Sequence, residues 1–358
     1  MNEPTRTDPG GVTEWKLDDM VVRLREWGTD RIYELPTAAT GEWLIGTERT
    51  CEVRLVDHRR LASRRHARLS RDRTTWTLTD AGSKNGLWLD DARRPSFVLT
   101  PGIEIGIGGL RLVAESRRMI DVRAFLSRIL GWSAERQNQI DRALRSLREM
   151  ATRRAPLVLL GEGDLVAVAR SLHRKVLGED RPFIVSDPRR VSMRVSSRSP
   201  KNYADVRMAL QAAEGGTLCV WASRLPNDFD EVRAQLERPG EHVRVVMCAY
   251  TMDEIQERIP LGAAITLTPL SQRAEELDRI IDEYAADAID ELGASASSFT
   301  VDDRAWTRRR RAKTLEEIET TVMRLVAIRE WGGAARAAPH LGITRVALLR
   351  WFDRRSRH

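Results

Sequence analysis

The period at which apolar residues recur changes along the chain, and this constrains the fold more than any other feature of the sequence. From Val21 to about Val113 short apolar runs alternate with Gly, Asp and Pro turns, which predicts an antiparallel sandwich or barrel. From 115 to 154 the period becomes helical. After Leu157 uninterrupted apolar strands alternate with helices, which predicts a buried parallel sheet. The last stretch, 301–352, is predicted to be helical throughout.

These changes predict a multidomain chain, and its 358 residues suffice for two or three domains. We expect a disordered tail at 1–11, an all-β domain at 12–115, a helical linker at 116–154, an α/β domain at 155–292, a short linker at 293–300 and an all-α domain at 301–358. Strands are predicted at 32–35, 43–45, 53–55, 67–70, 75–79, 87–89, 104–107 and 110–113, and again at 157–160, 183–186, 217–221 and 243–248.

Composition excludes several classes of protein. Apolar residues make up 42% of the chain, so it is not wholly disordered. The sequence has no run of eighteen apolar residues and a polar N-terminus, so we expect no membrane partner, no secretory signal and a cytoplasmic location. Cys51, Cys219 and Cys248 lack the spacing of a zinc site and are expected to be reduced thiols.

The position of the net charge is more informative than its size. The chain carries +7, and the segment 301–358 alone holds 14 Lys or Arg against 7 Asp or Glu, so the rest of the chain is neutral. Localised positive charge indicates an anionic partner, with nucleic acid the first candidate. A solvated basic tail is the alternative.

Four short motifs in the first domain occur in a fixed order. They are Ile45-Gly46, then Ser63-Arg64-Arg65-His66, then Gly82-Ser83-Lys84-Asn85-Gly86, then Pro101-Gly102. This segment resembles a forkhead-associated (FHA) domain. The resemblance implies an eleven-stranded sandwich that binds phosphothreonine through loops at one end, with Gly46 and His66 as architectural residues.

The residues of these loops suit a phosphate. Phosphothreonine carries about −1.5 to −2 charges and three acceptor oxygens, so it needs cations, a hydroxyl and an amide on loops held by a rigid sheet. We therefore predict a phosphopeptide site. Its candidate residues are Arg49, Ser63, Arg64, Ser83, Lys84 and Asn85.

Three positions depart from the FHA pattern. Thr47 follows Gly46 where the family usually has an arginine, Leu87 stands in place of a threonine, and Asp90-Asp91 replaces an Asn-Gly turn. Because the usual arginine is a main phosphate ligand, the alternative is a sandwich that binds an unphosphorylated partner.

The α/β segment from Pro156 to Arg273 resembles the AAA+ domain of bacterial enhancer-binding proteins, the activators of sigma-54 polymerase. The shared landmarks include Leu159-Leu160-Gly161-Glu162, Gly215-Gly216-Thr217-Leu218 and Pro269-Leu270 with Arg273. The resemblance implies a nucleotide fold, but its chemistry is missing from this sequence.

A phosphate-binding loop reads G-x-x-x-x-G-K-[ST]. The loop here, Gly161-Glu162-Gly163-Asp164-Leu165, is shorter, has no lysine and adds two carboxylates. The strand 217–221 ends in Trp221-Ala222 without the acidic pair that holds Mg²⁺. The stretch 188–203 lacks the polymerase-contacting G-A-F-T-G-A loop, and no other catalytic constellation is evident. We predict a pseudo-ATPase scaffold, not an enzyme and without a cofactor or metal; ATP binding without hydrolysis is the alternative.

The C-terminal segment resembles the Fis-type helix-turn-helix that ends enhancer-binding proteins. The stretch from Ala337-Ala338 through Leu341-Gly342-Ile343-Thr344-Arg345 to Leu348 matches the A-A-x-x-L-G-I-[ST]-R-x-x-L pattern without a gap. Gly342 is expected to adopt a positive φ at the turn, and Thr344 to cap the second helix. Ile343, Leu348 and Phe352 are expected to pack inward. The candidate DNA-binding residues are Thr344, Arg345, Val346, Ala347 and Arg350.

Other residues of this segment bear on assembly and on the strength of the motif. Leu315, Ile318, Val322 and Leu325 form an apolar seam that predicts a homodimer, and Arg308–Arg311 are expected to contact phosphates. Gly333 and Pro339 depart from the pattern and weaken the first helix. A small helical bundle with a basic face is the alternative.

Together the domains predict a cytoplasmic DNA-binding transcriptional regulator that reads phosphothreonine. The alternative is a signalling adaptor in a Ser/Thr kinase pathway, in which the helix-turn-helix serves only dimerisation. The expected partners are DNA, a phosphothreonine-containing protein and a second copy of the chain.

Overall fold

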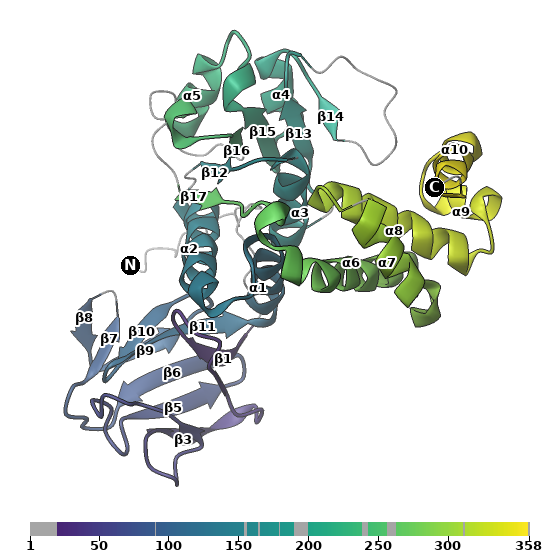
Figure 1. Cartoon of the computed structure of the whole chain (residues 1–358). Helices are drawn as coiled ribbons and strands as arrows, with labels where there is room; N and C mark the ends of the chain where they lie inside the picture. The colour runs from purple at the N-terminus through teal and green to yellow at the C-terminus, as the bar shows by residue number, and fades with distance from the viewer. Residues whose placement is uncertain are drawn as a thin grey trace, which may run out of the picture. The chain divides into compact units, whose positions relative to one another are not determined.

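A computed structural model describes residues 20–356 apart from 90, 154–155, 164, 179, 190–199, 238–242, 256–262 and 311. The predicted tail at 1–11 lies outside these residues, as do Asp90, Asp164, Arg311 and most of the stretch 188–203. The chain forms two compact units, one of residues 1–154 with 175–178 and one of 155–174 with 179–358 (Figure 1).

The first unit begins with a β-sandwich. Eleven strands of the described residues form a six-stranded sheet of order β2-β1-β11-β10-β7-β8 and a five-stranded sheet of order β4-β3-β5-β6-β9 (Figure 1). They are β1 (Val21–Glu26), β2 (Ile32–Glu34), β3 (Thr40–Gly46), β4 (Val53–Arg54), β5 (Ala67–Asp72), β6 (Thr75–Asp80), β7 (Leu87–Leu89), β8 (Ala92–Arg94), β9 (Ser96–Leu99), β10 (Glu104–Ile107) and β11 (Leu110–Ser116).

Alternation of apolar and polar residues places each strand in the sandwich. On β5, Ala67 and Leu69 are fully buried while Arg68 between them is exposed. Trp76 of β6 fills the centre of the core, and its indole N–H donates to the carbonyl of Val21 (2.9 Å). The eight strands predicted in this region are confirmed. Strands β8 and β9 were not predicted, because Ala92–Arg94 and Ser96–Leu99 lie at sheet edges and bury little apolar surface.

Two helices pack onto this sandwich. Strand β11 ends at Ser116, whose hydroxyl accepts from the N–H of Met119 (3.3 Å) and caps α1 (Arg117–Leu130). A short turn leads into α2 (Gln137–Arg153). The apolar faces of α1 and α2 are buried, and both helices belong to the same compact unit as the sandwich. The segment predicted as a linker is therefore part of the first unit.

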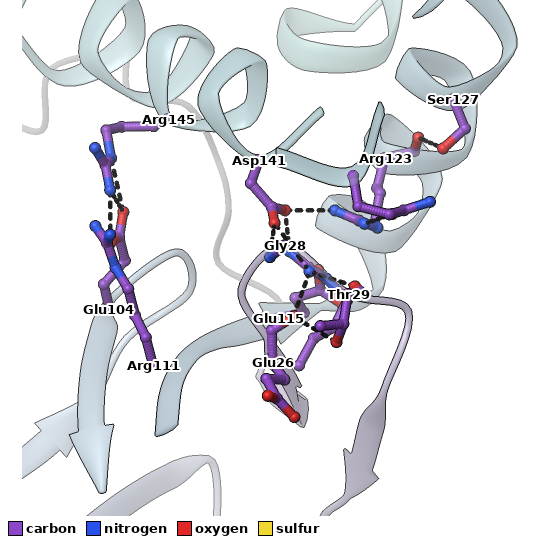
Figure 2. Close-up of polar contacts among 12 residues, drawn as sticks. Glu26, Gly28, Thr29, Glu104, Arg111, Glu115, Arg123, Ser127, Asp141 and Arg145 are labelled. Atoms are coloured by element: carbon purple, nitrogen blue, oxygen red, sulfur yellow. Dashed lines mark hydrogen bonds and ion pairs between the residues drawn. The ribbon is translucent and has the colours of Figure 1, made fainter. Parts of the chain in front are cut away.

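A buried ion-pair network fastens these helices to the sheet (Figure 2). Arg25 of β1 donates to Glu115 of β11 (2.7 Å) and to Asp141 of α2, and Arg123 of α1 donates to the same Asp141 (2.6 Å). The amide N–H of Gly28 also donates to Asp141 (2.6 Å). Arg25, Glu115 and Asp141 are at most 1% exposed. Burial, together with the charge of Arg25, lowers the pKa of Arg123.

The second unit begins with a parallel sheet of order β14-β13-β15-β16-β12-β17. Its strands are β12 (Leu157–Leu160), β13 (Phe183–Ser186), β14 (Lys201–Asn202), β15 (Thr217–Trp221), β16 (Arg244–Ala249) and β17 (Ala263–Thr266). The four predicted strands are confirmed. On neighbouring strands, the Sγ atoms of Cys219 and Cys248 lie 3.7 Å apart.

Helices cover this sheet on both faces. Helices α4 (Val206–Ala212) and α5 (Asp230–Glu237) pack on one face, where Val206 and Val232 join Val220 and Val245 in one apolar cluster. Helix α3 (Leu165–Leu177) contacts the sheet through His173, whose Nδ1 accepts from the Thr217 hydroxyl (2.8 Å) while its Nε2 donates to the carbonyl of Arg181 (3.0 Å). Both ring nitrogens of this buried histidine thus have a hydrogen-bond partner.

This histidine is expected to make the second unit sensitive to acid. Burial lowers the pKa of His173 below its ordinary value. The unfolded chain then binds the proton more readily, so the stabilisation is complete above about pH 6.5 and is lost as the pH falls toward the folded pKa. When the pH is lowered from 7 to 5.5, we expect the β15 amides of His173→Gln to lose less protection from hydrogen exchange than those of the wild-type chain. An identical loss in both proteins would contradict the assignment.

Five helices end the chain. They are α6 (Leu277–Leu292), α7 (Val301–Arg310), α8 (Leu315–Glu330), α9 (Ala334–His340) and α10 (Arg345–Ser356). Helix α8 lies centrally and packs against α6, α7 and α9. The structure therefore places α6, and the predicted linker at 293–300, with the C-terminal helices: Glu330 of α8 accepts from the N–H of Ser295 (2.8 Å) and the hydroxyl of Ser298 (2.6 Å).

The apolar seam of α8 is occupied within the chain. Ile318, Val322 and Leu325 are at most 2% exposed, and α6, which packs on α8, buries its own Ile280, Ile281, Tyr284, Ala285 and Ala288. A dimer formed through this seam would have to displace helices of the same chain that pack against α8. The seam therefore does not support the predicted dimer, because an amphipathic pattern specifies a buried face but not the element that covers it.

Candidate functional site

Three loops meet at one end of the sandwich, after β3, before β5 and before β7. His66 joins two of them: its Nδ1 accepts from the N–H of Ser63 (2.9 Å) and its Nε2 donates to the carbonyl of Gly86 (3.0 Å). The Ser63 hydroxyl accepts from the N–H of Lys84 (3.1 Å), and the Asn85 amide donates to the carbonyl of Leu61 (2.7 Å). These bonds bring the predicted residues of separate loops together.

Gly46 is required where the first loop meets the second. A Cβ on this residue would lie 2.1 Å from the carbonyl oxygen of Arg64, far inside any allowed contact. The following residues bind the same segment, since the N–H of Thr47 donates to Ser63 (3.3 Å) and that of Glu48 to Arg64 (3.0 Å). Both Gly46 and His66 thus position the loops.

The predicted site residues differ in exposure. Arg49, Arg64 and Lys84 are exposed, and Ser63 and Asn85 are half-buried. Ser83 is buried: its hydroxyl donates to Asp80 (2.5 Å) and accepts from the N–H of Gly86 (2.9 Å). Ser83 therefore shapes its own loop and does not face solvent.

The exposed groups form an anion-compatible surface. Ser63 accepts a backbone bond, so its hydroxyl hydrogen remains to donate to a ligand. Among the residues that the structure describes, no carboxylate forms an ion pair with Arg49, Arg64 or Lys84. A hydrogen bond from Arg65, and more weakly the charge of Arg64, lower the pKa of Glu48, so this acid of the first loop is already paired with Arg65.

Sequence reasoning missed the apex of the second loop. Asp57 accepts backbone N–H bonds from Arg59, Leu61 and Ala62, and this turn presents Arg59 and Arg60 to solvent. The only signal in the sequence is an aspartate two residues before a pair of arginines, which is typical of an Asx turn but also common in surface loops.

A two-sheet sandwich that gathers cations, a hydroxyl and an amide on loops at one end has the architecture of a ligand-recognition domain. The family of this domain is identified by a family model, that of the FHA domain, which matches residues 43–108. The chain therefore contains an FHA domain, as the motifs of the sequence indicate.

Several solved structures are similar to this chain. FHA-1 of Rv1747 from Mycobacterium tuberculosis is 30% identical, with a TM-score of 0.23, over 27% of this chain and 97% of its own. EmbR of Mycobacterium tuberculosis, solved with a low-affinity phosphopeptide, is 25% identical, with a TM-score of 0.24, over 26% of this chain and 24% of its own. A further FHA domain, described in terms of phosphothreonine-dependent interactions, is 27% identical, with a TM-score of 0.24, over 26% of this chain and 95% of its own.

No curated protein matches the chain. In the described part of the chain, no helix is both long and apolar enough to cross a membrane.

The parallel sheet has a second place where ligands usually bind. From β12 the chain continues to β13, toward one edge of the sheet, and from β16 it continues to β17, at the opposite edge. The carboxyl ends of the neighbouring strands β12 and β16 therefore form a topological switch point. The loop after β12 has an exposed Glu162, and the N–H of Gly161 is already bound to the carbonyl of Ala249 (3.1 Å). This N–H, one of the groups that would bind phosphate in a phosphate-binding loop, thus already has a partner within the fold.

The carboxyl ends of the neighbouring strands hold other groups. Trp221, the last residue of β15, is in ring contact with Tyr250, which follows β16; the ring centroids lie 5.3 Å apart. Asp187, after β13, is 4% exposed and pairs with Arg224 (3.2 Å). The one buried carboxylate described at this edge therefore already has a cation.

The C-terminal helices contain a helix-turn-helix shape. Gly342 has a φ of 62°, and the Thr344 hydroxyl accepts from the N–H of Ala347 (3.2 Å), so the predicted turn and cap are confirmed. Ala337 and Ala338 are buried where α9 meets α10. Exposed positions on α10 and its cap are Thr344, Arg345, Val346, Ala347 and Arg350.

Two details of this region differ from prediction. Leu348 is buried as expected, but Phe352 and Ile343 are only half-buried, and Trp351 supplies the buried aromatic ring against Trp306 (6.0 Å between centroids). The expected phosphate contact Arg308 pairs with Asp278 of α6 (2.5 Å).

Proposed function

We propose that the FHA domain binds a phosphothreonine-containing segment of another protein. The observation that carries this proposal is the convergence of Arg64, Lys84 and the Ser63 hydroxyl, from two loops joined by hydrogen bonds, without a carboxylate that pairs with either cation in the described residues. A phosphate matches this set in charge and in acceptor oxygens. Arg49, on the neighbouring turn, supplies a further cation close to where the family has its usual arginine.

Calorimetric titration of the whole chain tests this proposal. The probe is a peptide library with a fixed central phosphothreonine and random flanks, and the same library with threonine is the reference. We expect measurable affinity for the phosphorylated library alone. Equal affinity for both libraries would instead support a phosphate-independent partner, the alternative that Thr47 raises.

We further propose that the α/β domain is a pseudo-ATPase that serves as a scaffold. Support comes from the loop after β12, which has no lysine, has an exposed Glu162 and uses the N–H of Gly161 within the fold. Purified chain with Mg²⁺ and ATP is expected to release no phosphate above a heat-inactivated control. Turnover that disappears when Gly163 is changed to Val would refute the proposal.

A role in DNA binding is the second candidate function, favoured by the exposed face of a capped α10. Its first half presents Arg345, Val346 and Ala347. In a helix-turn-helix, these positions of the second helix face base edges, and one arginine that forks onto guanine discriminates by about 1–3 kcal/mol. We therefore propose that the full chain is a cytoplasmic transcriptional regulator. The alternative is a signalling adaptor.

An Arg345→Ala substitution is expected to flatten the preference among DNA sequences, by roughly fivefold to a hundredfold at one base pair. Arg309→Ala on α7 is the matched control, because an arginine that contacts only phosphate contributes without regard to sequence. Binding selection from a random DNA pool measures both. Unchanged preference in Arg345→Ala would exclude α10 as the recognition helix, and no salt-dependent binding at all would favour the adaptor.

A further inference from the structure

The first helix of the helix-turn-helix gives the second helix only weak support. Helix α9 is seven residues long and contains Pro339, which removes one backbone hydrogen bond from the helix. Its buried residues are Ala334, Ala337 and Ala338, whose side chains each bury little apolar area. A recognition helix must nevertheless keep its base-reading side chains in a fixed direction. Contacts from outside the motif therefore matter for the direction of α10.

Trp351 connects α10 to two helices outside the motif. Its ring is 6% exposed and meets the ring of Trp306 in α7 edge to face, with centroids 6.0 Å apart and an interplanar angle of 76°. The guanidinium of Arg324 in α8 lies over the same ring, 5.4 Å from its centroid. Both arrangements are favourable for an aromatic ring. Trp351 is therefore held by α7 and α8 together.

Trp351 lies on the inner side of α10. Leu348 and Trp351 are three positions apart, and both are buried. Val346 and Arg350 are four positions apart, and both are exposed. Residues three or four positions apart share a face of a helix, so the two pairs mark its inner and outer faces. A shift of the Trp351 ring would turn the whole helix and redirect its exposed side chains.

Helix α7 is itself held by α6 on the side away from Trp306. Arg304 pairs with Asp282 of α6 (3.1 Å). One turn later, Arg308 pairs with Asp278 of α6 (2.5 Å). The two arginines are four positions apart and share one face of α7. Trp306 is two positions from each of them, so it lies on another side of the helix and remains available to α10.

Helix α8 holds α7 through a buried carboxylate. Asp303 is 1% exposed and accepts from Arg329 of α8 (2.7 Å) and from the hydroxyl of Thr300 (2.9 Å). Thr307, one turn later, is fully buried, and its hydroxyl donates to the carbonyl of Asp303 (2.8 Å). Ion pairs with two neighbouring helices therefore fix α7, and Trp306 meets α10 from a rigid support.

We propose that Trp306 is a positioning residue for DNA recognition: through Trp351 it holds α10 in the direction that brings Arg345 to base edges. This proposal rests on the proposed DNA-binding function. Readout of base edges depends on the direction of the side chain, whereas the attraction between exposed arginines and phosphates does not. Trp306 therefore acts on the preference among sequences and not on binding to DNA in general.

Binding selection from a random duplex pool with the whole wild-type chain first supplies a preferred sequence. Affinity is then measured for this duplex and for an unrelated duplex of the same length. Trp306→Leu keeps an apolar side chain but loses the ring contact, which corresponds to about twofold to tenfold in an equilibrium constant. We expect binding to the preferred duplex to weaken by about that factor. The affinity for the unrelated duplex, and its dependence on salt, are expected to stay unchanged.

Two further variants complete the test. Trp306→Phe keeps an aromatic ring and is expected to recover most of the lost affinity. Trp88→Leu makes the same change at a tryptophan that is 41% exposed in the FHA domain, and this matched control is expected to bind both duplexes as the wild-type chain does. A loss of folded protein would weaken binding to both duplexes alike, so the ratio of the two affinities separates positioning from a general structural effect.

An unchanged ratio in Trp306→Leu, or a ratio in Trp306→Phe that falls as far as in Trp306→Leu, would overturn the proposal. A wild-type chain that selects no sequence would instead refute the proposed DNA recognition, and the positioning role with it.

Discussion

Replacing Asp141 by alanine is expected to destabilise the first compact unit by about 3–5 kcal/mol. Asp141 accepts from Arg25, Arg123 and the N–H of Gly28 (Figure 2); the two arginine bonds are buried and the Gly28 bond is partly buried. Its removal leaves two buried guanidinium groups with one fewer carboxylate. An unpaired buried charge costs far more than an exposed ion pair contributes.

Hydrogen exchange of the whole chain measures this effect without assuming that the chain unfolds as one unit. Amides of β1, β11, α1 and α2 are expected to lose protection together in Asp141→Ala, because the network spans all four elements. Asp121→Asn, an exposed carboxylate on α1, is the control and is expected to change little. Loss of protection confined to α2 would show that the helices are not fastened to the sheet through this network.

The double substitution Arg64→Ala/Lys84→Ala is expected to weaken binding of a phosphothreonine peptide by roughly a hundredfold or more. A hydrogen bond to a charged group contributes about 1.5–3 kcal/mol, which corresponds to about tenfold or more for each cation. Both side chains are exposed, and the loop geometry uses their backbone atoms, so the fold should be retained.

Each single variant separates the two contributions in the same titration. Arg117→Ala removes an exposed positive charge at the start of α1, away from the loops, and is expected to retain wild-type affinity. Full affinity in the double variant would show that the phosphate, if it is read at all, is read elsewhere on the domain.

The contacts between the loops of the candidate site were largely predictable, because the residues that make them belong to short sequence motifs. The S-x-x-H spacing that includes Ser63 and His66, and the G-S-K-N-G run, both encode the bonds between His66, Ser63, Lys84 and Gly86. The role of Ser83 was not predictable, because a serine at this position of the motif can direct its hydroxyl either to a ligand or, as here, to Asp80.

The packing of the helices was not predictable from their own sequences. Arg25 and Asp141 are 116 positions apart, and each charged residue alone indicates a solvated surface. Likewise, the α8 seam predicted a buried face correctly but not the element that covers it, and α6, α7 and α9 of the same chain pack against α8.

Amide NMR spectra of the whole chain during titration with a phosphothreonine peptide test whether the loops after β3, before β5 and before β7 bind phosphothreonine. We expect the largest shifts at the amides of Ser63, Arg64, Lys84 and Asn85, and no such shifts with the unphosphorylated peptide. Shifts that are equal for both peptides, or that fall outside these loops, would contradict it.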